Sequence, residues 1–277
     1  MLYEKIHLRD DDPDVYLTVY APTCNEGMAQ RPAVVILPGG AYYGVSFREG
    51  EPIAFRFMSA GIVAFVLTYS VGEKAAFPRP LIDVSLAMRY IKKHAETYHV
   101  DENRVFVAGF SAGGHLAASV GTLWHLDCLK TEGDDPANAP QKPAGMILAY
   151  PVISSETALM EPNSFYNLLG TRNPTDEELK RYSIEKCVDS RTVPAFLMHT
   201  FEDTCVPVGN SLVMAEALAA NGISFEMHIY PYGGHGLSTA DPETSLGNPV
   251  CEIPKVAGWL DLAIDWLKSI RMGGADE

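Results

Sequence analysis

Six short apolar runs, separated by longer stretches of helical periodicity, constrain the fold of this 277-residue chain more than any other feature. Uninterrupted apolar runs of this length, such as 33–37, are typical of strands that are buried on both faces. The runs lie at 33–37, 62–67, 105–108, 146–149, 195–198 and 225–229, and the helical stretches at 51–60, 81–98, 111–124, 210–221 and 255–270. Strands that alternate with helices build βαβ units, so we predict an α/β fold with a mostly parallel central sheet and helices on both faces.

Two further segments complete the predicted architecture. Residues 14–21 alternate in polarity and are rich in β-branched and aromatic side chains, which favours an antiparallel strand pair at the sheet edge.

Residues 154–190 lie between two predicted strands and are too many for a plain connection. They hold either a crossover helix at 175–186 or a small cap over the site, and one insertion can do both. Because no repeat or linker interrupts the chain, we expect a single domain over 1–277.

The composition of the chain narrows the classes of function that it can have. The chain carries 35 acidic and 21 basic residues, a formal net charge of −14, and an acidic surface disfavours nucleic-acid and membrane partners. The chain contains no run of 18 apolar residues, the length at which a segment could span a bilayer. The N-terminus lacks a charged stretch followed by an apolar run, so we predict no secretory signal. Five scattered cysteines without a Cys-x-x-Cys pair then indicate free thiols in the cytoplasm and no metal site.

The segment Gly109-Phe-Ser-Ala-Gly113 matches the G-x-S-x-G pattern of a nucleophile elbow. The pattern needs its glycines because the serine occupies a sharp strand-to-helix turn, where side chains two residues away would collide. An apolar run precedes the segment and a helical stretch follows it, as an elbow requires. Ser111 is therefore the candidate nucleophile, and the alternative is an ordinary serine in a glycine-rich turn. The helix that follows would direct the Ala112 amide toward a developing oxyanion.

The segment Pro38-Gly-Gly-Ala-Tyr42 follows the first buried run. The HGGG-type loop of esterases and lipases occupies this position, and here proline replaces the histidine and alanine replaces the third glycine. Because backbone amides supply the chemistry, alanine should be tolerated, and we assign Gly40 and Ala41 as further oxyanion donors. The alternative is a plain type II turn between the strand and a loop.

The acid and the base of a nucleophile-elbow enzyme follow the serine in the chain order acid, then histidine. Asp203 comes just after the run 195–198, and His235 comes just after the run 225–229 between glycines that suit a presenting loop. We assign His235 as the general base and Asp203 as the carboxylate that fixes its tautomer. Glu202 is the competing acid, but Asp203 begins an Asp-x-x-Val-Pro turn into the next helix. The other seven histidines follow no suitable strand end, and we expect packing or surface roles for them.

The motifs together resemble a known family. Pro38-Gly-Gly-Ala-Tyr, Arg48-Glu-Gly-Glu-Pro, Gly109-Phe-Ser-Ala-Gly-Gly-His and Pro231-Tyr-Gly-Gly-His-Gly-Leu-Ser resemble the bacterial acetyl-esterase and xylanase-B-like group, which is related to hormone-sensitive-lipase-type esterases. The likeness covers about residues 31–270. It implies an α/β-hydrolase fold, a serine carboxylesterase without a cofactor, and a small acyl ester as substrate, such as an O-acetyl group on xylo-oligosaccharides.

Three tyrosines fall beside predicted strand ends, where a pocket is expected. Their rings could bind a sugar substrate, or they could fill the seam between the sheet and its loops. These residues are Tyr42, Tyr43 and Tyr69. The sequence leaves open whether the chain forms a homo-oligomer.

Three alternative functions compete with ester hydrolysis. An arylformamidase-like amidase suits the chain length, whereas a peptidase of the prolyl-oligopeptidase type usually adds a large N-terminal propeller, for which 277 residues leave no room. A non-catalytic binding protein on the same fold would typically lose a member of the triad, and here all three positions are filled.

Overall fold

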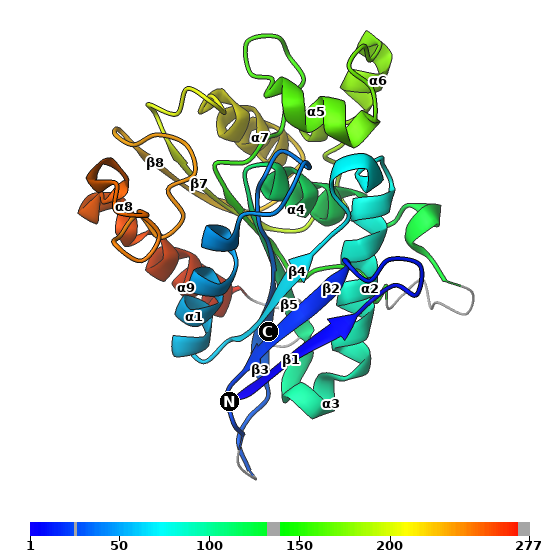
Figure 1. Cartoon of the computed structure of the whole chain (residues 1–277), viewed down its shortest axis with the longest axis vertical. Helices are drawn as coiled ribbons and strands as arrows, with labels where there is room; N and C mark the ends of the chain where they lie inside the picture. Colours follow the sequence, from blue (N-terminus) through cyan, green and yellow to red (C-terminus); the bar gives the residue numbers. More distant parts are fainter. Residues whose placement is uncertain (25–26, 132–138, 271–277) are drawn as a thin grey trace.

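The computed structural model describes residues 1–24, 27–131 and 139–270, and these residues form one twisted eight-stranded sheet (Figure 1). The strands are β1 (Leu2–His7), β2 (Tyr16–Ala21), β3 (Arg31–Leu37), β4 (Val63–Thr68), β5 (Val100–Phe110), β6 (Met146–Ala149), β7 (Ala195–Thr200) and β8 (Phe225–Tyr230). Their order across the sheet is β1-β2-β4-β3-β5-β6-β7-β8. Strand β2 pairs antiparallel with β1 and β4, and all the other pairs are parallel, which confirms the predicted sheet and its antiparallel edge.

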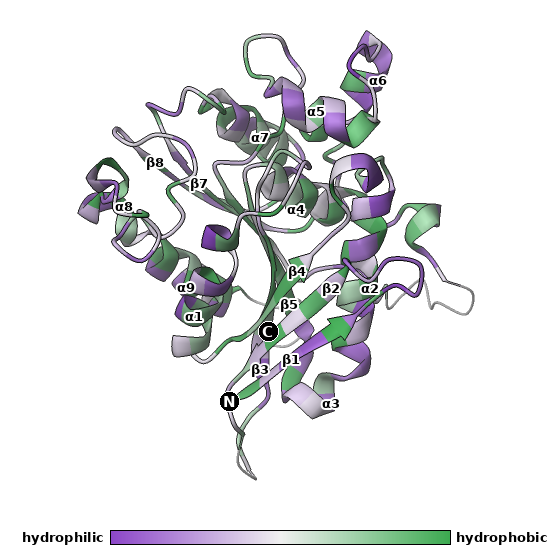
Figure 2. Cartoon of the chain, in the orientation of Figure 1, coloured by the Kyte–Doolittle hydropathy of each residue, from purple (hydrophilic) through white to green (hydrophobic). Residues whose placement is uncertain are grey.

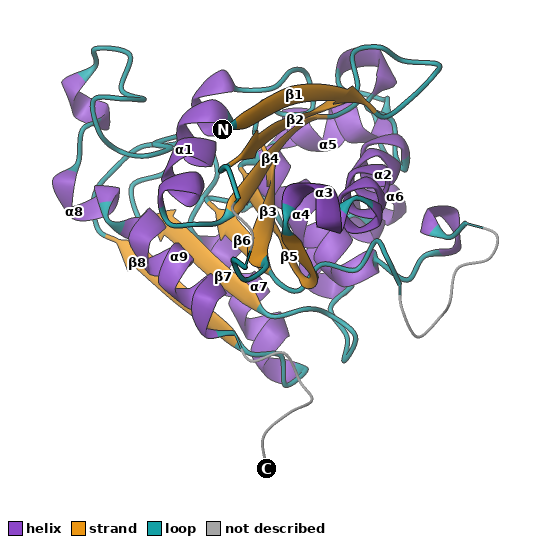
Figure 3. Ribbon diagram, turned by 90° about the horizontal axis from the view of Figure 1, so that it is seen from below, coloured by secondary structure: helices purple, strands orange, loops and turns teal. Residues whose placement is uncertain are grey.

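Helices cover both faces of the sheet, as predicted (Figure 3). They are α1 (Glu51–Ser59), α2 (Arg79–Lys93), α3 (Ala95–Tyr98), α4 (Ala112–Leu123), α5 (Pro162–Leu169), α6 (Asp176–Arg181), α7 (Gly209–Ala220), α8 (Pro254–Ala257) and α9 (Trp259–Ser269). Helices α1 and α9 pack on one face, whereas α2, α4 and α7 pack on the other. Because successive strand residues point to opposite faces, the strands from β2 to β8 contribute to both apolar layers.

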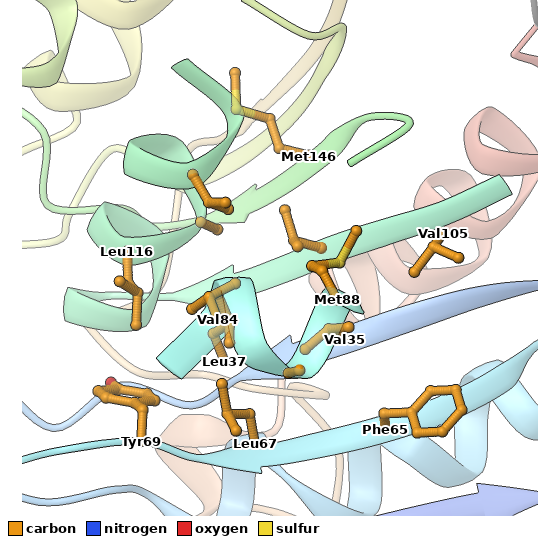
Figure 4. Close-up of a cluster of buried hydrophobic side chains, with 14 of the residues drawn as sticks. Val35, Leu37, Phe65, Leu67, Tyr69, Val84, Met88, Val105, Leu116 and Met146 are labelled. Carbon is orange, nitrogen blue, oxygen red and sulfur yellow. The ribbon is translucent and has the colours of Figure 1, made fainter. Parts of the chain in front are cut away.

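The layer beneath α2 and α4 is drawn in Figure 4. Val35 and Leu37 from β3 lie beside Leu67 from β4, and Val84 of α2 and Leu116 of α4 close over them. Each fully buried aliphatic side chain of this kind contributes about 1.5–3 kcal/mol to stability. In Figure 2 strand β4 is mainly green, as this burial requires, while many purple residues lie on the outer helices. No helix in the described ranges has the length and hydropathy needed to cross a membrane.

Three element boundaries differ from the prediction. The helix expected over 81–98 divides at His94, whose Nδ1 binds the carbonyl of Tyr90 at 2.8 Å, and the helix expected over 255–270 divides at Gly258. Strand β5 begins at Val100, because Val100 pairs with Arg31 beyond a register shift. Its first residues are polar, so the apolar run predicted only its second half.

The insertion between β6 and β7 contains α5, α6 and a 3₁₀ turn at Ile184–Lys186. Helix α6 and the turn occupy the predicted crossover segment 175–186. Helix α5 was not predicted; it lies beyond the sheet (Figure 1), and its Phe165 packs against Val152 and Val206. The insertion therefore links two strands and also covers part of the sheet end at which the candidate site lies.

Candidate active site

Ser111 occupies a sharp turn between β5 and α4. Its φ of 55° and ψ of −118° lie in a region that L-residues rarely adopt. The turn is tight enough that a Cβ on Gly109 would lie 2.1 Å from the carbonyl oxygen of Gly113. The glycines of the motif are thus required by close backbone approach, as the sequence pattern predicted. This turn places the serine side chain at the carboxyl end of the sheet.

His235 and Asp203 meet Ser111 at this end of the sheet. His235 Nε2 lies 2.7 Å from Ser111 Oγ, and His235 Nδ1 lies 2.6 Å from Asp203 Oδ2. Because a carboxylate only accepts hydrogen bonds, Nδ1 carries the proton and Nε2 accepts from the serine hydroxyl. Three side chains that follow β5, β7 and β8 therefore form one continuous hydrogen-bonded chain.

The Asp203 carboxylate is held from both sides. Its Oδ1 accepts from the amides of Cys205 and Val206 at 3.0 and 2.9 Å. Burial raises the pKa of Asp203, but hydrogen bonds from His199 and His235 outweigh burial and keep this pKa below its usual range. The carboxyl is therefore ionised at neutral pH, as the partner of a histidine base must be.

Glu202, the competing acid, is turned away from the histidine. Its side chain is exposed, and its Oε2 accepts from the Gly233 amide at 3.2 Å. The structure thus brings Asp203, and not Glu202, to the imidazole of His235.

The predicted oxyanion loop, Pro38–Tyr42, lies directly against the serine. A Cβ on Gly39 would lie 2.9 Å from the Cβ of Ser111, and Gly40 has a φ of 134° that favours glycine. Ala41 also has a positive φ, of 52°. Within the described ranges, the amides of Gly40, Ala41 and Ala112 make no hydrogen bond to the protein. Three free backbone donors beside a nucleophile are what an oxyanion needs.

Two of the predicted substrate-binding tyrosines differ from expectation. Tyr42 and Tyr69 are each 1% exposed, and Figure 4 places Tyr69 among the buried apolar side chains. The hydroxyl of Tyr69 donates to the Pro38 carbonyl at 2.5 Å, and that of Tyr42 lies 2.9 Å from His115 Nδ1. With both rings packed and both hydroxyls engaged, neither ring can stack on a sugar; they hold the oxyanion loop instead.

Tyr43 is placed differently, since 78% of it is exposed. Its ring remains available to a substrate, and a role for it stays a prediction.

His115 packs beneath the elbow, as expected for a histidine one turn into the helix. Its Nε2 lies 2.9 Å from the Tyr182 carbonyl and must donate to it, so Nδ1 accepts from the Tyr42 hydroxyl. Burial lowers the pKa of His115 to about 4, which keeps the ring neutral. The ring therefore links the oxyanion loop, α4 and the insertion.

Sequence analysis missed two buried polar residues behind the site. Glu49 accepts from the Gly39 amide through Oε2 and from the Tyr150 hydroxyl through Oε1, both at 2.8 Å. The Tyr150 ring lies edge-on to the His235 ring, with 5.1 Å between centroids. The resemblance includes the segment that contains Glu49, but nothing in its spacing indicates that the side chain turns inward.

The part of the chain that the structure describes contains no group of three or more acidic, histidine or cysteine side chains that could hold a metal ion. All five cysteines are free thiols.

Comparison with known proteins gives related sequences over most of the chain. A family model described as BD-FAE matches residues 17–218. Endo-1,4-beta-xylanase B of Butyrivibrio fibrisolvens is 39% identical over 217 residues, which make up 77% of this chain but 34% of that protein. An acetylxylan esterase of Xylanibacter ruminicola is 30% identical over 232 residues, or 82% of this chain and 44% of that protein. The chain thus spans less than half the length of these two relatives.

Solved structures match along nearly the whole chain. An acetyl ester-xyloside bifunctional hydrolase from Caldicellulosiruptor lactoaceticus has a TM-score of 0.82 and 36% identity, with 96% of each chain covered. The carboxylesterase Cest-2923 from Lactobacillus plantarum has a TM-score of 0.80 and 28% identity, with 97% of each chain covered. These likenesses confirm the α/β-hydrolase fold and the resemblance to the acetyl-esterase and xylanase-B-like group. The names of the acetylxylan esterase, the acetyl ester-xyloside hydrolase and the carboxylesterase agree with the expectation of an esterase.

Proposed function

Because this chain belongs to the BD-FAE family, whose model matches residues 17–218, we propose that it is a serine carboxylesterase that acts through an acyl-enzyme. The observation that carries this proposal is the hydrogen-bonded chain from Ser111 through His235 to Asp203, with distances of 2.7 and 2.6 Å. Nucleophile, base and orienting carboxylate are thus in contact in the order that acyl transfer requires.

In the acylation step, Ser111 Oγ attacks the ester carbonyl while His235 Nε2 takes the hydroxyl proton. Asp203 stabilises the imidazolium that forms and holds it in the productive orientation. The carbonyl oxygen becomes negatively charged, and the free amides of Gly40, Ala41 and Ala112 donate to it. His235 then gives its proton to the departing alcohol, and an acyl-serine ester remains.

In the deacylation step, a water molecule takes the place of the alcohol. His235 accepts a proton from this water, and the hydroxide attacks the acyl carbonyl. The same amides stabilise the second oxyanion. Collapse of this intermediate releases the carboxylic acid and returns the proton to Ser111, so the cycle needs no group beyond the chain's own residues and water.

For the substrate we propose small acyl esters, with acetyl groups on xylo-oligosaccharides as the favoured class. The support comes from relatives: one is named an acetylxylan esterase, and a structure with 36% identity is titled an acetyl ester-xyloside hydrolase. Exposed Tyr43, directly after the oxyanion loop, offers a ring face to a sugar.

Replacement of the nucleophile tests the reaction class. We expect Ser111→Ala to lower kcat for p-nitrophenyl acetate by at least about 10⁴-fold, because no acyl-enzyme can form. Ser119→Ala is the matched control: Ser119 is buried on the same helix, but its hydroxyl donates to the His115 carbonyl. Full activity of the Ser111 variant would overturn the assignment.

A substrate panel tests the class of ester. We expect kcat/KM for acetylated xylo-oligosaccharides to exceed that for longer-chain p-nitrophenyl esters, and turnover of N-formyl or peptidyl anilides to be negligible. Faster cleavage of the anilides would instead identify an amidase on the same fold.

A further inference from the structure

Glu49 is a carboxylate buried behind the candidate site, with 5% of the residue exposed. It follows β3 by twelve residues and lies in a 3₁₀ turn at Phe47–Glu49. Its Oε2 accepts from the amide of Gly39, next to the assigned donor Gly40, at 2.8 Å. A buried charge is costly unless it is fully hydrogen-bonded, so the hydrogen-bond partners of Glu49 decide whether its carboxylate can be charged there.

The second partner, Tyr150, faces the loop that carries the base, residues 231–245. The Tyr150 oxygen accepts from the Ser238 amide at 3.0 Å, and its own proton therefore donates to Glu49 Oε1. Both oxygens of Glu49 then act as acceptors, and the ionised form satisfies every member of this network. Protonation of Glu49 would leave one donor without an acceptor.

We propose that Glu49 is a positioning residue, whose carboxylate fixes the oxyanion loop and the base loop in one hydrogen-bonded frame. This inference rests on the proposed esterase function. It assigns to Glu49 no contact with the substrate: its effect passes through the Gly39 peptide on one side and through Tyr150 on the other.

The neighbouring residue, Arg48, joins the 3₁₀ turn itself to the base loop. Arg48 donates through Nε to the Thr244 carbonyl at 2.6 Å and through Nη2 to the Gly236 carbonyl at 3.1 Å. In return, the Ser238 hydroxyl donates to the Arg48 carbonyl at 2.6 Å. The dipeptide Arg48–Glu49 thus holds the base loop from both its backbone and its side chains.

The charge of Glu49 also acts on the base. Burial raises the pKa of Glu49 above its usual range, and the hydrogen bonds from Tyr150 and Gly39 and the charges of His235 and Arg48 offset only part of this rise. Because coupling between two sites is reciprocal, the carboxylate favours the imidazolium that forms during attack. The other titratable groups against this site are Asp203, which binds the imidazole, and the buried hydroxyls of Tyr69 and Tyr150.

Glu49→Gln tests this role while preserving side-chain shape. The amide oxygen can still accept from Gly39, but its NH₂ group faces Tyr150, whose proton loses its acceptor. We expect kcat for p-nitrophenyl acetate to fall roughly 10- to 100-fold, with KM changed less than about 3-fold. The acid limb of the kcat/KM profile should move to lower pH, because a negative charge that favours imidazolium is gone.

Glu51→Gln is the matched control. Glu51 lies two residues away, is exposed, and accepts from a different tyrosine hydroxyl, that of Tyr20, at 2.8 Å. We expect its kcat and its pH profile to equal those of the unaltered enzyme. The active fraction of each variant is counted by end-point titration with an organophosphate, so that incomplete folding is not mistaken for slow turnover.

If Glu49→Gln fails to fold, Tyr150→Phe tests the same frame, because it keeps the ring and removes only the hydroxyl. We expect the same preferential loss of kcat. A Glu49→Gln enzyme that matches Glu51→Gln in both kcat and acid limb would overturn the inference, as would an unaffected Tyr150→Phe enzyme. If Ser111→Ala is also fully active, the proposed reaction through an acyl-Ser111 intermediate fails; if Ser111→Ala is inactive, only the role of Glu49 fails.

Discussion

At the scale of single residues, the site depends on which proton each nitrogen of His235 carries. Asp203 accepts from Nδ1, so Nε2 is free to receive the proton of Ser111. The carboxylate itself is oriented by two backbone amides of the turn that follows it. A side chain of the same shape but reversed hydrogen bonding should therefore damage catalysis without disturbing the fold.

Asp203→Asn makes this change. Its NH₂ group would donate to Nδ1 and favour the tautomer in which Nε2 carries a proton and cannot act as base. We expect kcat for p-nitrophenyl acetate to fall by roughly 10²- to 10⁴-fold with a near-normal fold by circular dichroism. Glu202→Gln, at the neighbouring exposed carboxylate, should change kcat by less than about 3-fold. A larger loss in Glu202→Gln than in Asp203→Asn would reverse the assignment of the acid.

Residues that follow strand ends could be predicted from the sequence, because parallel strands bring their carboxyl ends together. Ser111, Asp203 and His235 each follow an apolar run and converge as expected. Glu49 and Tyr150 could not be found in this way. Glu49 lies in a polar segment away from any strand end, and its burial depends on tertiary packing that no local pattern records.

At the scale of elements, helix α4 follows the nucleophile turn and also connects two other segments of the site. His115, one turn along it, joins the Tyr42 hydroxyl of the oxyanion loop to the Tyr182 carbonyl of the insertion. The ring is neutral because burial lowers its pKa to about 4. In a charged ring Nδ1 could only donate, so the contact with Tyr42 would have to reverse and the Tyr42 hydroxyl proton would lose its acceptor.

This junction predicts a pH dependence of stability. The pKa of His115 is about 4 in the folded chain and about 6.5 in the unfolded chain. Between pH 4 and pH 6.5 the unfolded chain therefore binds more protons than the folded chain. Neutral His115 therefore contributes its full share to the free energy of unfolding above pH 6.5. This share is lost as the pH falls toward 4. Between pH 7 and pH 5 the loss should be about 2 kcal/mol.

Urea unfolding at pH 7 and pH 5 measures this effect. His115→Gln should remove most of the decline, whereas His7→Gln, at an exposed histidine, should leave it unchanged. The lowered pKa of Asp203 keeps its own titration below this window. If His115→Gln keeps the full decline, His115 is not its source.

Helix α5 marks the limit of element prediction. Glu161 caps its first turn, Pro162 begins it, and Gly170 ends it with a φ of 66°. These are recognisable start and stop signals, but the helix has only eight residues and lies in an insertion without strong periodicity. Its contact with the site, from Asn167 Nδ2 to the Ala41 carbonyl at 2.8 Å, could be found only from the structure.

At the scale of the whole molecule, one sheet carries two apolar layers and a single reactive end. The order of apolar runs and helical stretches was enough to predict the parallel sheet and the helices on both faces, because most of the runs are buried and helices such as α2 and α9 are amphipathic. The run at 225–229 differs, because β8 lies at the sheet edge and is only partly buried. The pairing of β5 beyond its apolar half and the division of two helices depend on contacts between distant segments, and were therefore not predicted.

Labelling of the nucleophile tests the central claim most directly. The intact protein is treated with an active-site-directed organophosphate, and mass spectrometry locates the adduct. We predict one phosphoryl group per chain, on Ser111, with loss of esterase activity in proportion to labelling, and no adduct in Ser111→Ala. Labelling at another residue, or ester hydrolysis that continues after Ser111 is fully modified, would contradict the account.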